Sequence, residues 1–181
     1  MHTKLESKKK VHKTNQTYFL LGYKTPLAKH KDTPVLGVIR AILDRGQSSR
    51  LFDEIRSKRG LAYAVGAAHE AALTYGYFAV SVITNKKNVP RVRKVVLEQL
   101  QLPSLSKKEL NEAKQYLEGS LILSNEDNLE RAERNAFCAF LGRNQKKYMA
   151  ALKRVTLQDI KRVTKKYFHK NFTETIIEQK G

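Results

Sequence analysis

The spacing of apolar positions changes along the chain and separates candidate strands from candidate helices. Residues 17–23, 61–69, 75–84 and 172–178 are rich in β-branched, aromatic or alternating apolar residues, which favours strands. A short connection, residues 70–74, joins the second of these segments to the third. We therefore expect those two strands to form an antiparallel hairpin.

Most of the remaining chain repeats apolar residues at helical spacing, and many of these segments begin at residues that cap helices. Asp32 followed by Pro34 indicates one helix start, and Ser106 with Glu109 forms a capping box that indicates another. The predicted helical segments are 32–46, 48–60, 88–100, 106–121, 124–142, 144–154 and 156–168.

The order of these elements is one strand, two helices, two strands, several helices and a final strand. Strands and helices do not alternate strictly, so a doubly wound parallel sheet is not expected. The pattern instead predicts an α+β fold, a largely antiparallel sheet with helices packed on one face. We expect a flexible basic lead-in over residues 1–13 and a single domain over residues 14–181.

Composition indicates the cellular compartment in which this protein is expected. No apolar run approaches the ~20 residues that a membrane-spanning helix needs, and the N-terminus lacks the apolar stretch of a signal peptide. The single cysteine, Cys138, allows no disulfide within the chain, which fits a reducing compartment. These observations predict no membrane association and a cytoplasmic location.

Charge is the next informative property. The chain has 35 Lys and Arg against 17 Asp and Glu, a net charge of +18, which attracts polyanions or an acidic partner. Basic residues are densest over residues 143–170. Either this region is a solvated helix face or it is a nucleic-acid-binding patch, but no aromatic residues interleave with its charges, which weakens the second interpretation.

The usual ligand and nucleophile motifs are missing. Of the five histidines, no two stand four residues apart, so neither H-x-x-E-H nor H-E-x-x-H occurs. His69 and Glu70 begin a near match to the second motif, but Leu73 stands where its second histidine belongs, so we interpret His69 as a turn or edge residue. Cys138 lies within an apolar helical stripe, where a buried, inert thiol is expected. We therefore predict no metal site and no cofactor in this chain.

One stretch, residues 46–63, combines a helix, a stop at Gly60 and the start of a strand. It contains the motifs Ser48-Ser49-Arg50-Leu51-Phe52 and Gly60-Leu61-Ala62-Tyr63. These motifs resemble the signature of the second, non-zinc half of pitrilysin-type zinc metallopeptidases, a family that includes the mitochondrial processing peptidases. Weaker likenesses follow in the family's order across residues 17–177, among them Thr25-Pro26, Tyr75-Gly76-Tyr77-Phe78, Glu109-Leu110 and Val155-Thr156.

The resemblance implies that two similar halves face each other and have different functions. One half carries H-x-x-E-H, binds zinc and supplies a Glu general base, and the other closes the chamber over the peptide. In this sequence the substrate-contacting Arg and Tyr of the second half match Arg56 and Tyr63. Without the resemblance, Arg56 would be interpreted as a solvated helix residue and Tyr63 as a core strand residue.

The sequence therefore predicts a substrate-binding partner of a zinc-bearing half, with no peptidase activity of its own. The partner half is expected either in the same longer chain or in a separate subunit, and an acidic partner would balance the charge. Two alternatives remain open, namely a scaffold homologue without a protease role and a basic nucleic-acid-binding module that uses residues 143–170. A steep salt dependence of DNA or RNA affinity would support the latter.

Overall fold

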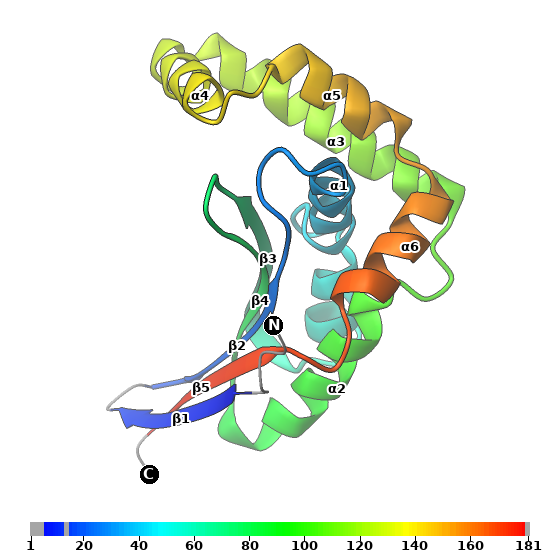
Figure 1. The fold of residues 1–181 in the computed structure, drawn as a ribbon. Coiled ribbons are helices and arrows are strands. Elements are labelled where there is room, and N and C mark those ends of the chain that lie inside the picture. The colour runs from blue at the N-terminus through cyan, green and yellow to red at the C-terminus, as the bar shows by residue number, and fades with distance from the viewer. Residues whose placement is uncertain (1–5, 13–14, 180–181) are drawn as a thin grey trace.

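A computed structural model describes residues 6–12 and 15–179. Its five-stranded sheet has the order β1-β5-β2-β4-β3, with β1 and β5 parallel and the other neighbours antiparallel. The strands are β1 (Glu6–His12), β2 (Thr17–Lys24), β3 (Ala62–Ala71), β4 (Gly76–Thr84) and β5 (Thr173–Gln179). The helices cover one face of this sheet and leave the other open, which confirms the predicted α+β fold (Figure 1).

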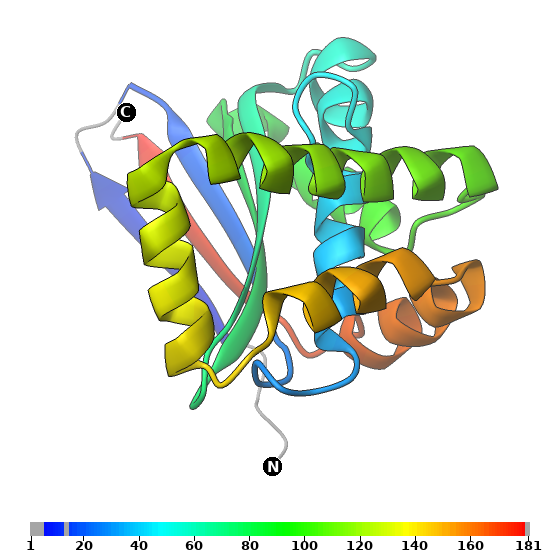
Figure 2. The same cartoon turned by 90° about the horizontal axis from the view of Figure 1, so that it is seen from above.

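The helices form the second part of the architecture. They are α1 (Thr33–Leu43), α2 (Val89–Leu100), α3 (Lys107–Glu126), α4 (Asn128–Phe140), α5 (Gln145–Arg154) and α6 (Leu157–Tyr167), with a π-helix η1 (Phe52–Ser57) and a short 3-10 turn η2 (Lys86–Asn88). Helix α1 is central, because it contacts β3 on one side and α3, α5 and α6 on others. Seen from above, α3 and α5 lie across it (Figure 2).

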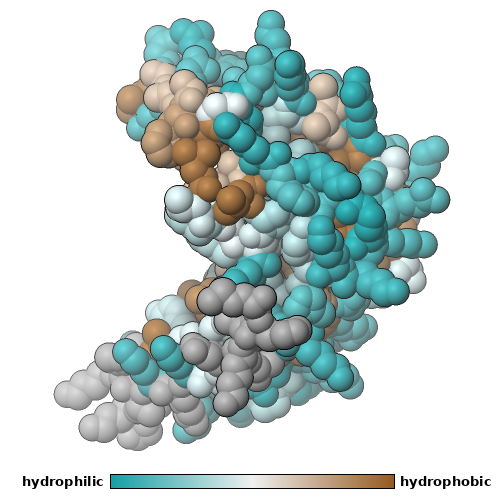
Figure 3. Space-filling view, in the orientation of Figure 1, coloured by the Kyte–Doolittle hydropathy of each residue, from teal (hydrophilic) through white to brown (hydrophobic). Residues whose placement is uncertain are grey.

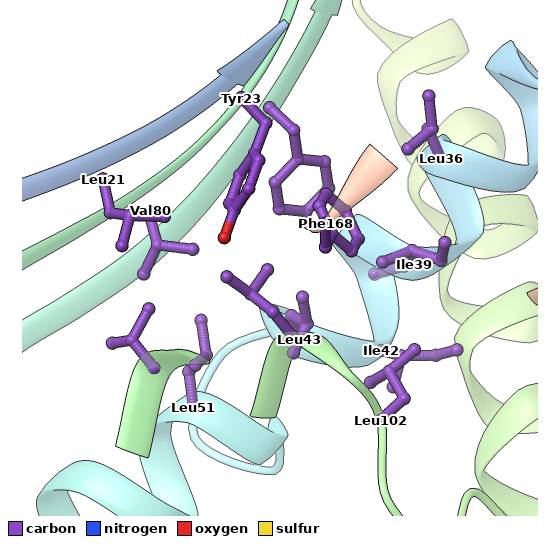
Figure 4. Packing of buried hydrophobic residues seen from close by; sticks show 14 of the residues in the cluster. Leu21, Tyr23, Leu36, Ile39, Ile42, Leu43, Leu51, Val80, Leu102 and Phe168 are labelled. Carbon is purple, nitrogen blue, oxygen red and sulfur yellow. The ribbon is translucent and has the colours of Figure 1, made fainter. Parts of the chain in front are cut away.

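The core lies between the covered face of the sheet and helix α1. On β2, Phe19, Leu21 and Tyr23 are buried while their neighbours Tyr18 and Leu20 are exposed, as expected for a sheet with one packed face. Helix α1 is buried almost all round because it has sheet on one side and helices on the other. The close-up in Figure 4 shows Tyr23 from the sheet meeting Phe168 from the end of α6.

Several predicted helix starts are confirmed with the expected hydrogen bonds. Ser106 and Glu109 form a capping box at α3, and Thr156 with Asp159 forms another at α6. The start of α4 lies slightly later than expected, because Asp127 provides its cap and α3 continues through Glu126. Capping residues in the sequence therefore predicted where these helices begin, although the exact first residue of α4 differs.

Asp32 does not cap helix α1 as predicted. Its side chain is fully buried and turns away from the helix to accept hydrogen bonds from Arg162, Lys166 and Tyr167, at 2.7, 3.0 and 2.9 Å. Burial alone would raise the pKa of Asp32, but these three donors lower it to about 2. The carboxylate thus joins α1 to α6, two elements far apart in sequence.

Residues Glu6–His12, which we expected within a flexible lead-in, form strand β1. This strand lies at the edge of the sheet and pairs in parallel with β5. Main-chain pairing needs no apolar side chains, and lysines on an edge strand discourage pairing with other chains, so a lysine-rich segment suits this position. The remainder of the predicted lead-in lies outside the described residues.

The apolar stripe of α4 is not part of the core. Leu129, Phe137 and Phe140 are 68%, 51% and 70% exposed, and no residue of α4 is buried. Cys138, expected to be buried, is only partly so. The helix extends beyond the sheet and packs mainly on α3, which explains why its stripe meets no core (Figure 1).

Candidate functional site

The stretch that attracted attention in the sequence forms a tight junction between η1 and β3. The helix is of the π type, as shown by the bond from the Lys58 N–H to the Asp53 carbonyl, five residues back. Gly60 ends it with a φ of +57°, a conformation that a side chain would strain. The next carbonyl, of Leu61, accepts a 2.5 Å hydrogen bond from the Thr84 hydroxyl, which fixes the start of β3 against the end of β4.

Most residues of the signature are structural. Leu51, Ile55 and Leu61 are buried in the core. Arg50 reaches α3 and donates to both oxygens of Glu109, at 2.7 and 3.1 Å. Burial would raise the pKa of Glu109, but the hydrogen bonds from Arg50 and from the Ser106 cap lower it to about 2. The first half of the motif therefore anchors the junction to the domain.

Arg56 is different, because it points outward from η1. It is exposed, and its guanidinium carbon lies 5.1 Å from the centre of the Phe52 ring. Nearby cations are already engaged: Lys58 pairs with Asp53 and Glu54, and Arg59 pairs with Glu54. Within residues 6–12 and 15–179, Arg56 has no ion-pair partner, so its donors are available to a ligand.

Tyr63 lies where β3 departs from regular pairing. Ala62 pairs with Thr84 and Ala64 with Ile83, so Tyr63 is an extra residue in a β-bulge. Its side chain is 53% exposed, and its hydroxyl makes only a long 3.4 Å contact with Asn85. The interpretation of Tyr63 as a core residue is therefore wrong, because the bulge turns this side chain out of the packed layer.

The sequence signalled both residues but not their local geometry. A π-helix and a β-bulge each insert a residue relative to regular structure, and both occur often at functional sites. Apolar periodicity carries no sign of such an insertion, since Leu51, Ile55 and Leu61 are buried in either case. The structure therefore explains, through this local geometry, why the side chains of Arg56 and Tyr63 are free.

Across the described residues, no group of three or more His, Cys, Asp or Glu side chains is placed to hold an ion. His69 lies in β3, stacked on Phe78. Burial, together with the charges of Arg143 and Arg40, lowers the pKa of His69 to about 4, so it is neutral near pH 7. The His, Cys, Asp and Glu side chains that the structure describes therefore form no grouping that fits a zinc ion.

Two cations of the basic region, residues 143–170, form ion pairs within the fold. Arg162 and Lys166, two of the cations expected on a solvated face, hold the buried Asp32. None of the described helices is long and apolar enough to cross a membrane.

Comparison with known proteins shows which family and which relatives this chain resembles. A family model described as the peptidase M16 inactive domain matches residues 2–117. An uncharacterized zinc protease of Mycobacterium tuberculosis is 29% identical over 92% of this chain and 39% of its own length. For the uncharacterized zinc protease YmxG of Bacillus subtilis the identity is 26%, over 99% of this chain and 45% of the relative. The chain therefore spans less than half the length of these curated relatives.

A solved structure agrees with the fold. The inactive peptidase domain of a putative zinc protease from Bordetella parapertussis superposes with a TM-score of 0.79 and covers 92% of both chains, at 18% identity. At that level of identity the likeness concerns the fold alone.

Proposed function

We propose a function from the premise that this chain belongs to the peptidase M16 inactive-domain family: it is the substrate-binding, non-zinc half of a zinc metallopeptidase. It works with a half that bears H-x-x-E-H, and together they hydrolyse peptides in extended or unfolded form. Arg56 and Tyr63 contact the bound peptide. The relatives named as zinc proteases, which are more than twice as long as the matched region, support this division between two halves.

The observation that carries the proposal is that two residues of the signature, Arg56 and Tyr63, make few contacts within the fold. Arg56 projects from a π-helix without an ion pair among the described residues, and Tyr63 projects from a bulge with only a weak hydrogen bond. Elsewhere in the stretch, Leu51, Ile55 and Leu61 are buried and Arg50 is bound to Glu109 of α3, while Lys58 and Arg59 pair with acidic residues of η1. The anchored backbone fixes where the two side chains begin, and their unpaired donors are available to a ligand.

The two side chains suit peptide chemistry. The Arg56 guanidinium presents donors in a fixed plane to a peptide carbonyl or a carboxylate. The Tyr63 hydroxyl donates a single hydrogen bond to an oxygen on which negative charge develops during hydrolysis, where a positioned donor contributes about 3 kcal/mol. In this proposal, zinc held by the partner half would supply the hydrolytic chemistry, while Arg56 and Tyr63 position the peptide.

In this proposal the zinc-bearing partner half is essential, and the positive charge of the present chain favours a partner with an acidic surface. A net charge of +18 favours association with an acidic surface and speeds the encounter. Mixing this chain with the cognate H-x-x-E-H half should give a stable complex that cleaves unstructured peptides, whereas this chain alone should be inactive. A complex that forms without any cleavage would favour the scaffold alternative, and no complex at physiological salt would contradict the proposal.

Variants of the assembled enzyme test the residues. Tyr63→Phe should lower kcat by about a hundredfold with little change in thermal stability, because it removes one positioned donor. Tyr18→Phe is the matched control, since Tyr18 is also an exposed sheet tyrosine. Arg56→Gln should raise KM or lower kcat, while Arg91→Gln, at an exposed position on α2, should do neither. Equal rates for Tyr63→Phe and its control would remove Tyr63 from the mechanism.

A cytoplasmic location is part of the proposal and rests on the single cysteine of the sequence. Fractionation of the native protein should place it with cytoplasmic markers.

A further inference from the structure

Arg56 is an exposed cation on a surface that carries many. The chain has 35 Lys and Arg residues, and hydrophilic residues cover much of the surface in the view of Figure 3. Exposure alone therefore does not distinguish Arg56 from other surface cations. What distinguishes it is that an acid, Asp53, lies three residues earlier in the same helix and yet pairs with another residue.

The spacing of Asp53 and Arg56 favours an ion pair between them on an ordinary helix. On an α-helix, residues three or four apart are neighbours, and an Asp three positions before an Arg attracts it. Asp53 and Arg56 have this spacing. If η1 were an α-helix, we would expect the Asp53 carboxylate to hold the Arg56 guanidinium. Such a pair would compete with any ligand for the same N–H donors.

The wider turn of the π-helix pairs Asp53 with a different residue. The Lys58 N–H donates to the Asp53 carbonyl at 2.9 Å, which brings together positions five residues apart. The same two residues also meet through their side chains, with 2.8 Å between Lys58 Nζ and Asp53 Oδ2. The Asp53 carboxylate is therefore held by Lys58 and not by Arg56.

Glu54, the other acid of η1, is occupied as well. Lys58 Nζ lies 2.7 Å from Glu54 Oε1, and Arg59 donates to the Glu54 carboxylate and, at 2.6 Å, to its main-chain carbonyl. The hydrogen bonds from Lys58 and Arg59 lower the pKa of Glu54, so it is ionised near pH 7. Two acids and two bases thus balance one another, and Arg56 carries the remaining positive charge of residues 53–59.

An aromatic ring holds Arg56 in place of a carboxylate. Its guanidinium carbon lies 5.1 Å from the centre of the Phe52 ring, four residues earlier in the chain. A cation over the face of a ring is attracted by the ring electrons and uses none of its N–H donors on a carboxylate. The donors of Arg56 thus remain available, while the ring limits where the guanidinium lies.

We propose that Lys58 is a positioning residue for Arg56: by holding Asp53, it keeps that carboxylate from capturing the guanidinium, which stays open to a bound peptide. Lys58 does not touch the peptide in this arrangement and acts only through Arg56. The inference rests on the proposed function for its effect on peptides, whereas the state of the Arg56 guanidinium is a property of this chain alone.

The exposure of these groups sets the size of the effect. The side chains of Lys58 and Asp53 are 56% and 49% exposed. Removal of the Lys58 charge leaves Glu54 with Arg59 but leaves Asp53 without a cation, three residues from Arg56. The long Arg56 side chain can then turn from Phe52 to this carboxylate. An exposed ion pair of this kind shifts an equilibrium by up to about fivefold, so the expected changes are of that size.

Chemical modification measures the state of Arg56 without any protease activity. The probe is phenylglyoxal, which reacts with free guanidinium groups, applied to the full chain. Mass spectrometry then compares the modification of Arg56 with that of Arg91, which is exposed on α2. Lys58→Gln should slow the modification of Arg56 relative to Arg91 by about two- to fivefold. Lys58→Arg keeps the cation and should react like the unchanged chain, as should Lys94→Gln, the matched change at an exposed site on α2.

A second substitution guards against a folding artefact. Asp53→Asn removes the carboxylate that Lys58→Gln releases, so the double variant Lys58→Gln/Asp53→Asn should return Arg56 to its original rate of modification. Damage to the helix would not be reversed by this change, and circular dichroism measures the helix directly. Slower modification that Asp53→Asn does not reverse would overturn the inference, and so would equal rates for Lys58→Gln and Lys94→Gln.

The assembled enzyme gives a second readout. Lys58→Gln should change the same kinetic constant as Arg56→Gln, KM or kcat, by a smaller factor of about two- to fivefold. In an Arg56→Gln background it should have no further effect, because Lys58 acts through Arg56. Independent, multiplicative losses would overturn the inference. If Arg56→Gln leaves cleavage unchanged, the proposed role of Arg56 fails, while the modification rates still decide whether Lys58 holds Asp53 away.

Discussion

Helices α6 and α4 each carry an apolar stripe, yet only one of them belongs to the core. Ile160 and Val163 of α6 are at most 1% exposed, whereas Leu129 and Phe140 of α4 are 68% and 70% exposed. Both helices begin at a side-chain cap, so their local sequence signals are alike. An amphipathic pattern predicts a helix and its apolar side, but not what that side will meet.

The two helices also differ in how they are held. Helix α6 is joined to the start of α1 by the buried carboxylate of Asp32. Helix α4 is tied to the end of α3 through Arg134, which donates to the Ser124 carbonyl at 2.7 Å and to the Asn125 side chain at 3.1 Å. One attachment depends on an ionised carboxylate and the other does not, which makes them separable by experiment.

The largest expected effect concerns the buried stripe. Ile160→Ala should lower the free energy of unfolding by about 2–5 kcal/mol, because it leaves a cavity between α6 and the core. Urea unfolding followed by circular dichroism measures it. Leu129→Ala is the matched control on α4 and should change stability by less than about 0.5 kcal/mol. Similar losses for both variants would show that α4 is packed in solution.

The attachment of α6 can be weakened on its own. Asp32→Asn should cost about 1–3 kcal/mol, since it removes charge-assisted hydrogen bonds whose partners remain partly solvated. Asp53→Asn, in an exposed pair with Lys58, should cost no more than about 1 kcal/mol. If the two variants unfold at the same urea concentration, the carboxylate does not join α6 to α1.

Acid should loosen α6 before α4. The pKa of Asp32 is about 2 in the folded protein and about 3.9 when unfolded. The stability that this carboxylate contributes, about 2–3 kcal/mol, is therefore complete above about pH 5 and is lost as the pH falls through 2. Hydrogen exchange between pH 5 and pH 2, corrected for intrinsic rates, should show protection lost first in α6. Asp32→Asn should remove that difference.

The smallest effect on stability is expected on the exposed stripe. Phe137→Ser and Phe140→Ser should each change the free energy of unfolding by less than about 0.5 kcal/mol, because neither ring is buried. Urea unfolding followed by circular dichroism measures both variants. A loss above about 2 kcal/mol would mean that the rings are covered in the folded chain.

Much of the fold followed from short-range signals. The alternation in 75–84 gave strand β4, and the short connection after 61–69 indicated the hairpin partner that the register confirms. The order of elements pointed to a largely antiparallel sheet covered on one face, which is observed. Strand β1 was missed because Glu6–His12 has no apolar periodicity, and its pairing with β5 depends on main-chain hydrogen bonds.

The candidate site was likewise predictable from the sequence only in part. Its two residues, Arg56 and Tyr63, came from a resemblance of motifs, and no rule of spacing separates them from Arg50 or Leu51. The structure assigns Arg50 to Glu109 and Leu51 to the core, which leaves Arg56 and Tyr63 free. Their role on a substrate stays a prediction for the assembled enzyme.

The sequence by itself determined which segments become helices and strands, where most helices begin, and that this chain holds no zinc-binding motif. These properties depend on residues a few positions apart, so local chemistry decides them. The tertiary structure alone decided that the stripe of α6 is core and that of α4 is surface, that Asp32 joins two helices, and that Glu6–His12 pairs with β5. Each of these joins residues that are distant in sequence, and only the packing of the whole chain brings them together.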